Sequence, residues 1–69
     1  MKDFSREQWL EILGQFYKDC FDFWIRQDVG IDAAKERART DVSVVHYFPY
    51  APQGPRIPLE IKDEFMKSL

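Results

Sequence analysis

The stretch FSREQWLEILGQFYKDCFDFWIRQDVG, residues 4 to 30, decides the fold, because it contains no proline and carries helix signals at both ends. Ser5 is a favoured N-cap residue, and the side chain of Gln8, at the third helical position, can reach back to the cap backbone. Gly30 can adopt the left-handed conformation that ends a helix. The stretch therefore predicts one long helix over about 6–28.

This predicted helix has more apolar side chains than a single core face needs. At about 100° per residue they fall into two neighbouring stripes. The first stripe holds Trp9, Leu13, Phe16, Cys20 and Phe23, the second holds Leu10, Tyr17, Phe21 and Trp24, and Ile12 and Ile25 widen the apolar arc. Each large apolar side chain left in water forgoes roughly 1.5–3 kcal/mol, so the second stripe needs its own cover.

A second helix is predicted over about 33–47, within IDAAKERARTDVSVVHYF. Asp32 is a candidate N-cap for it. Apolar residues recur at helical spacing through Ile31, Ala34, Ala38, Val42, Val45 and Phe48. The alanines permit close approach, and the short connection favours an antiparallel hairpin with the first helix. The last part, 42–48, is rich in β-branched and aromatic residues and could instead be a strand.

The segment FPYAPQGPRIP, residues 48 to 58, has prolines at positions 49, 52, 55 and 58. A spacing of three is the repeat of the polyproline II helix. We expect a polyproline II strap over 49–58 that lays its rings on Tyr17, Phe21 and Trp24. The alternative is a displayed ligand for an aromatic groove of the SH3 or WW type on another protein.

A short third helix is predicted over about 59–68, within IPLEIKDEFMKSL. Pro58 occupies a favoured first helical position, and Ile61, Phe65 and Leu69 follow four residues apart. With 69 residues, of which 45% are apolar, the chain predicts one all-α domain over 1–69. A core of this size supplies only ~3–5 kcal/mol of net stability.

Composition excludes several classes of partner. A net charge of -2 gives no general attraction to phosphate or anionic lipid, so neither nucleic acid nor a membrane is an expected partner. The start MKDFSREQW lacks a basic region followed by an apolar run, and no segment approaches the ~18 apolar residues that cross a bilayer. Cys20 is the single cysteine, which precludes an intramolecular disulfide and favours a cytoplasmic location.

No residue pattern indicates catalysis. Cys20 lies on an apolar stripe, where a thiol behaves as a small hydrophobe, so a Cys20–His46 nucleophile pair is not favoured. Asp19 and Asp22 share a helix face but have no third acid beside them, which indicates a solvated surface and not a metal site. We expect no enzyme activity, no metal, no cofactor and no small-molecule substrate.

Asp41 is unusual because helical periodicity points it toward the core, with Ala38 and Val45. An acid in that position needs a partner, and Arg37, one turn earlier, is the available one. The functional alternative is that Asp41 engages an arginine of another protein.

The aromatic surplus of the first helix favours a non-catalytic protein-interaction module: an accessory subunit, an inhibitor or a self-associating adaptor. The candidate contact residues are Tyr17, Phe21, Trp24, Ile25, Tyr47 and Tyr50. The sequence leaves open whether the surplus apolar surface is covered by 49–58, by a second copy of the chain or by another protein.

The alternative function is a small DNA-binding regulator of helix-turn-helix type that uses Lys35, Arg37 and Arg39. Its third helix would bring acidic residues to the major groove, because it carries Glu60, Asp63 and Glu64. The protein-interaction function is therefore the leading prediction.

Overall fold

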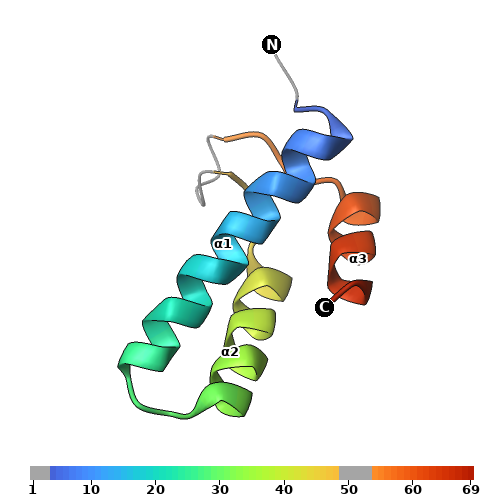
Figure 1. Ribbon diagram of the computed structural model, residues 1–69. Helices are drawn as coiled ribbons and strands as arrows, with labels where there is room; N and C mark the ends of the chain where they lie inside the picture. The colour runs from blue at the N-terminus through green and yellow to red at the C-terminus, as the bar shows by residue number, and fades with distance from the viewer. Residues whose placement is uncertain (1–3, 49–53) are drawn as a thin grey trace.

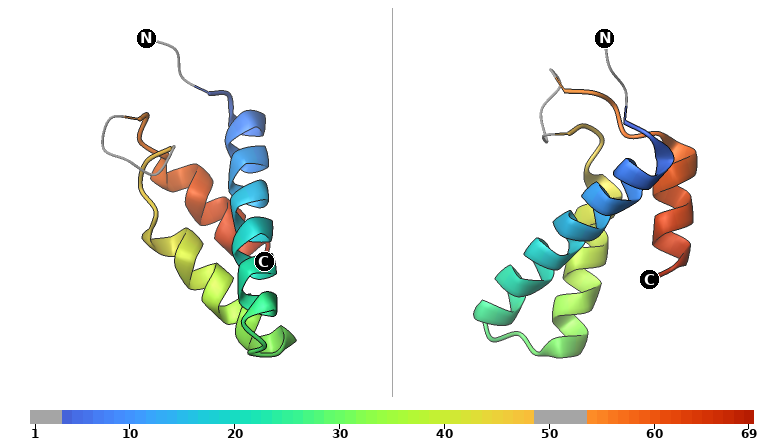
Figure 2. Two further views of the ribbon diagram at one scale, coloured as in Figure 1. Left: turned by 90° about the vertical axis from the view of Figure 1, so that its left-hand side faces the viewer. Right: turned by 45° about the horizontal axis from the view of Figure 1, so that its top comes forward.

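The computed structural model describes residues 4–48 and 54–69, and within them it contains the helices α1 (Arg6–Arg26), α2 (Ile31–Val44) and α3 (Leu59–Lys67). α1 and α2 form an antiparallel hairpin, and α3 lies beside the N-terminal half of α1 (Figure 1). The further views in Figure 2 show the same hairpin, with α3 on one side of it. The predicted all-α hairpin with a short third helix is confirmed.

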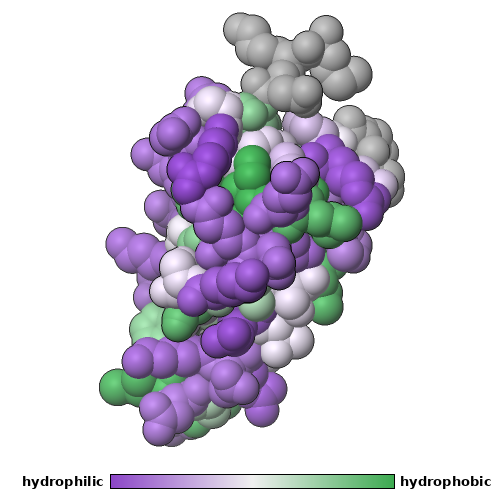
Figure 3. All heavy atoms as spheres, turned by 90° about the vertical axis from the view of Figure 1, so that its right-hand side faces the viewer, coloured by the Kyte–Doolittle hydropathy of each residue, from purple (hydrophilic) through white to green (hydrophobic). Residues whose placement is uncertain are grey.

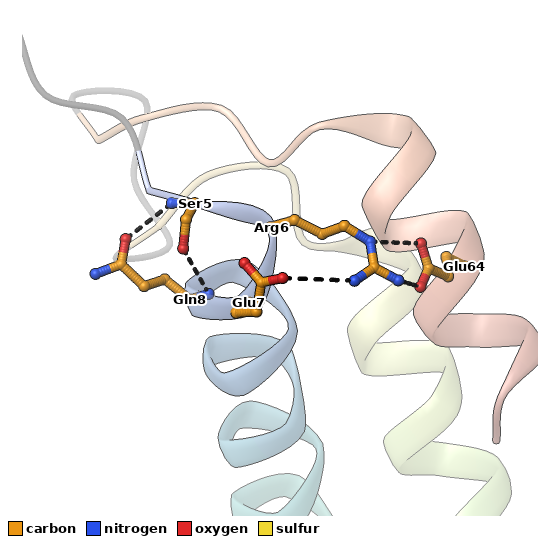
Figure 4. Close-up of polar contacts among 5 residues, drawn as sticks. All are labelled: Ser5, Arg6, Glu7, Gln8 and Glu64. Carbon is orange, nitrogen blue, oxygen red and sulfur yellow. Dashed lines mark hydrogen bonds and ion pairs between the residues drawn. The ribbon is translucent and has the colours of Figure 1, made fainter.

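α1 begins with the capping box that its sequence predicts (Figure 4). The backbone N–H of Gln8 donates to Ser5 Oγ at 3.2 Å, and the backbone N–H of Ser5 donates to Gln8 Oε1 at 2.8 Å. The ring of Phe4 meets the ring of Trp9 edge-on, with centroids 5.0 Å apart. These contacts satisfy backbone donors that have no partner inside the helix, and they fix the direction in which the chain enters it.

The turn between α1 and α2 differs from the expectation. α1 ends at Arg26, and the left-handed residue just beyond it is Asp28, with φ of 60°. Aspartate tolerates this conformation better than most side chains. Gly30, with φ of 92°, is instead the N-cap residue of α2, which therefore begins at Ile31. Asp32 lies in the first turn of α2 and is not its N-cap. Its negative charge interacts favourably with the helix dipole at this end.

α2 ends at Val44, three residues before its predicted end. Val45 is extended, with φ of -83° and ψ of 135°, and Tyr47 forms an isolated antiparallel β-bridge with Arg56. The ambiguous segment 42–48 is therefore helical at its start and extended from Val45 onward. Its β-branched and aromatic composition favours the extended part.

The predicted polyproline strap falls partly on residues 49–53, which lie outside the described residues. Across that gap the chain runs antiparallel to itself, because the backbone N–H of Phe48 donates to the carbonyl of Pro55 at 3.0 Å. The described residues 54–58 therefore return beside the end of α2, and the strap over 49–58 as a whole stays a prediction.

The core lies between the N-terminal half of α1, the inner face of α2 and the proline-rich segment. Among the described residues its buried apolar side chains are Trp9, Leu13, Ala34, Ala38, Val42 and Ile57. Ile57 stands between Arg56 and Pro58, and its backbone N–H donates to the carbonyl of His46 at 2.8 Å. The described part of the segment thus contributes an isoleucine to the core beside Trp9.

α3 covers Tyr17, one of the three residues on which the prolines were expected to lie. The ring of Tyr17 meets Phe65 of α3 edge-on, with centroids 6.4 Å apart. At the surface, Arg6 Nε donates to Glu64 Oε1 at 3.2 Å, and a second guanidinium nitrogen pairs with Glu64 Oε2 (Figure 4). This pair links the start of α1 to α3, and as an exposed pair it contributes ~0.2–1 kcal/mol.

Lys62 ties α3 to the end of α2. Its side chain is buried, and Nζ donates to the backbone carbonyls of Ser43 at 2.7 Å and Val45 at 2.5 Å. Carbonyls at a helix C-terminus have no donor inside the helix, and the dipole there favours a cation. Burial, and secondarily the charge of Arg56, lower the pKa of Lys62.

Candidate protein-interaction site

The turn end of the hairpin carries apolar side chains that the other elements do not cover. Phe23 is 52% exposed, Ile25 39% and Ile31 61%. Together with Trp24 they form what we call the hairpin tip. The ring contact between α3 and α1 lies earlier in α1, at Tyr17. Figure 3 shows apolar surface at the lower end, the height of the α1–α2 turn in Figure 1, and a second apolar area higher up, with hydrophilic side chains between them.

Trp24 is held in place by polar contacts with α2. Its Nε1–H donates to Asp41 Oδ2 at 2.9 Å, and the guanidinium of Arg37 lies 4.9 Å from its ring centroid. The ring of Phe23 meets it edge-on at 5.0 Å. Asp41 is thus bonded to Trp24 and not to Arg37, which was its predicted partner. A half-buried indole N–H needs an acceptor, and Arg37 gains a cation–π contact instead.

Cys20 lies beside Asp41 and is not set up as a nucleophile. Burial raises the pKa of the Cys20 thiol to about 11, with further contributions from the charge of Asp41, a hydrogen bond to Asp41 and the charge of Asp19. The thiol is therefore protonated at neutral pH, whereas the thiolate is the reactive form. His46 lines a different hollow, between α2 and α3.

Four of the six candidate contact residues lie along α1. Trp24 and Ile25 are at the hairpin tip, and Ile25 is exposed while Trp24 is half-buried. Phe21 is half-buried one turn earlier, and Tyr17 is half-buried against α3. Exposed apolar surface on α1 is therefore concentrated in its last turn.

The other two candidates do not join the hairpin tip. Tyr47 follows the far end of α2, where the Arg56 guanidinium lies 5.6 Å from its ring centroid and Arg56 Nη1 donates to its hydroxyl at 3.3 Å. Tyr50 lies outside the described residues. A contact surface that combines Trp24 with Tyr47 would have to extend from Arg37 and Asp41, which the Trp24 ring contacts, past the end of α2.

Sequence reasoning assigned two exposed residues of the tip to the core. Phe23 belongs to the first apolar stripe, and Ile31 has the spacing of the core face of α2, yet both are exposed. Both lie within one turn of the α1–α2 connection, where two helices alone cannot surround a large side chain. The position of both residues close to a helix end was the feature of the sequence that could have predicted their exposure.

The basic residues of α2 do not form one face. Lys35 and Arg39 line a hollow with Tyr17, whereas Arg37 lines another with Trp24 and stacks on its ring. A DNA-reading helix presents its basic side chains to one groove. This separation weakens the DNA-binding alternative.

Within residues 4–48 and 54–69, no cluster of histidine, cysteine and acidic side chains could hold a metal ion. In the same part of the chain, no helix is both long enough and apolar enough to span a membrane. Comparison with protein-family models, curated proteins and solved structures finds no match to this chain.

Proposed function

We propose that this chain is a non-catalytic protein-interaction module that binds through the hairpin tip. The observation that carries the proposal is the exposure of Phe23, Ile25 and Ile31 at one end of the molecule. Full burial of such a side chain is worth ~1.5–3 kcal/mol, and roughly half of that is still to be gained at each of these positions. Aromatic side chains at the centre of a polar surface are typical of protein interfaces.

The charges around the tip favour a protein as the occupant. The surrounding exposed residues are of both signs: Asp22, Arg26, Asp28 and Asp32. An anionic membrane or a nucleic acid needs a cluster of positive charge, which these residues do not provide. The occupant is another protein or a second copy of this chain, so the proposal includes an accessory subunit, an inhibitor and a self-associating adaptor.

A cytoplasmic setting is part of the proposal. Cys20 is the only cysteine of the 69 residues, and the fold is held by helix packing without any cross-link. Small domains of oxidising compartments usually depend on disulfides, whereas a lone thiol suits a reducing compartment.

The test compares association in tip variants with association in a matched control. Phe23→Ser and Ile31→Ser remove exposed apolar groups from the tip, and Val44→Ser removes a side chain that is 64% exposed at the other end of α2. Light scattering at micromolar concentration measures self-association, and affinity capture measures binding of another protein. We expect association to be lost in both tip variants and kept in Val44→Ser.

The fold should survive all three changes, because surface substitutions usually alter stability by only about 0.5 kcal/mol. Association that persists in both tip variants, or that is lost equally in Val44→Ser, would contradict the proposal. So would a monomer that captures nothing.

A further inference from the structure

A groove of about 570 Å³ separates α3 from the end of α2. Its lining residues are Leu59, Glu60, Lys62, Asp63 and Met66 on α3, with Ser43 and His46 facing them. This volume falls within the ~300–1,000 Å³ range of ligand-binding pockets. The groove begins at the opposite end of α2 from Ile31 and is therefore separate from the hairpin tip.

The floor of the groove is fixed in place. Lys62 donates to the carbonyls of Ser43 and Val45, so its ammonium caps α2 and is not available as the main anchor for an anion. The same bonds hold the two walls at a set separation. A site with a preformed shape loses less entropy when it binds.

The rim combines an exposed apolar side chain with carboxylates. Leu59 is 63% exposed, and the exposed acids Glu60 and Asp63 flank it. Within the described residues, Glu60 forms no ion pair, and Asp63 forms one with Lys67, at 3.8 Å between two exposed groups. Glu60 is therefore free to meet a cation from outside, whereas Asp63 would exchange its exposed pair with Lys67 for such a contact.

A second copy of the chain fits this groove poorly. Asp63 lies midway between Leu59 and Met66 on the groove face of α3. A two-fold pairing of α3 with its own copy would bring the two Asp63 carboxylates together at the axis. Symmetric interfaces place the same surface on both sides, and like charges there are unfavourable.

We propose that this groove is a second protein-binding site, and that it takes a segment of another protein with an apolar side chain flanked by lysine or arginine. The apolar side chain packs on Leu59 and Met66, and the basic groups pair with Glu60 and Asp63. An amphipathic helix presents this combination on one face. With the hairpin tip at the other end of α2, the chain then bridges two proteins.

The experiment uses the full chain and a synthetic amphipathic helix built from leucine and lysine, with a leucine–glutamate twin as the negative control. Backbone amide NMR shifts map where each peptide binds. We expect saturable shifts at Ser43, His46, Leu59 and Met66 with the lysine peptide and none with its twin.

Variants then separate the groove from general attraction to an acidic protein. Leu59→Ser should weaken binding about tenfold, since the loss of one partly buried leucine costs ~1.5 kcal/mol. Glu60→Gln and Asp63→Asn should each weaken it about two- to fivefold, whereas Asp22→Asn and Ile31→Ser should leave it unchanged. Because Ile31→Ser changes the hairpin tip and not the groove, it distinguishes binding in the groove from binding at the tip.

Three outcomes would overturn the proposal. The first is a set of shifts scattered over the acidic surface, or insensitive to Leu59→Ser. The second is equal binding of the glutamate peptide. The third is a change of the groove shifts on dilution of the protein alone, which would make a second copy the occupant.

Discussion

Gly30 joins α1 to α2 with φ of 92° and ψ of 159°. This region of backbone space is essentially restricted to glycine, because a Cβ would clash with the backbone of the same residue. No neighbouring atom lies within 4 Å of the position that a Cβ would take. The constraint is therefore conformational and not one of packing.

Gly30→Ala should lower the free energy of unfolding by ~1–3 kcal/mol, the range for a side chain forced into this region. Gly14→Ala is the matched control, because Gly14 lies inside α1 and its Cβ would meet Phe65 at an ordinary 3.9 Å. That change should raise the free energy of unfolding by ~0.5–1 kcal/mol. Urea unfolding of both variants checks the prediction, and losses of equal size would contradict it.

Cys20 makes the stability depend on alkaline pH. Burial raises the pKa of its thiol from 9.0 to about 11 in the fold, so the folded state keeps its proton where the unfolded state loses it. The stabilisation from Cys20 is therefore complete below pH 9 and falls as the pH rises toward 11. Each pKa unit corresponds to at most ~1.4 kcal/mol, and solvent screens part of this at a thiol that is only partly buried, so the fall is about 1 kcal/mol.

The measurement is the stability difference between the wild type and Cys20→Ala across this pH range. We expect the wild type to lose its advantage as pH rises. The lowered pKa of Lys62 acts with the opposite sign in the alkaline range, but it is present in both proteins and cancels in the difference. A difference that does not change with pH would contradict the prediction.

At the scale of elements, features that depend on neighbouring residues could be predicted from the sequence, whereas features that depend on tertiary contacts could not. The capping box of α1 depends on Ser5 and Gln8 alone, and it could be predicted from the sequence. The end of α2 depends on pairing between Tyr47 and Arg56, nine residues away, which periodicity does not reveal. The proline spacing suggested a rod, but the described ends of that segment pair with each other.

Ile57 should therefore matter more to the fold than the proline beside it in the segment. Ile57 is buried with Trp9 and Leu13, and Ile57→Ala should cost ~2–5 kcal/mol, which is most of the stability of so small a core. Pro55→Ala keeps the carbonyl that accepts from Phe48 and should cost only ~0.4–1 kcal/mol through the unfolded chain. Thermal melts compare the stability losses of the two variants. A larger loss in Pro55→Ala than in Ile57→Ala would contradict the prediction and indicate that the proline rings make the main contact.

The attachment of α3 to α2 can be tested at Lys62. Lys62→Met keeps the length of the side chain but leaves the carbonyls of Ser43 and Val45 without that donor, at a cost of ~1–3 kcal/mol. Lys67→Met, on the exposed side of the same helix, should change stability by less than ~0.5 kcal/mol. Equal effects in chemical unfolding would mean that Lys62 acts only as a surface charge.

Over the whole molecule, the core is concentrated at one end. Ile57, Val42 and the first half of α1 form a packed cluster, while the tip has only two helices to cover it. Helical periodicity gave the angle of each side chain around α1. It did not give the point along the axis at which covering elements stop, so Phe23 was misassigned and Tyr47 was grouped with residues at the far end.

This uneven packing predicts uneven protection in amide hydrogen exchange. Amides exchange through local opening, whose free energy is small where few apolar contacts must break. In the dilute chain we expect fast exchange at residues 21–26 and 31–33, and slow exchange at residues 9–13 and 38–42. If the tip is a binding surface, its exchange should slow when a partner or a second copy binds, whereas exchange in the core region should change little. Uniform protection along α1 in the dilute chain would mean that the tip is already stable by itself, and it would remove the reason to assign it a partner.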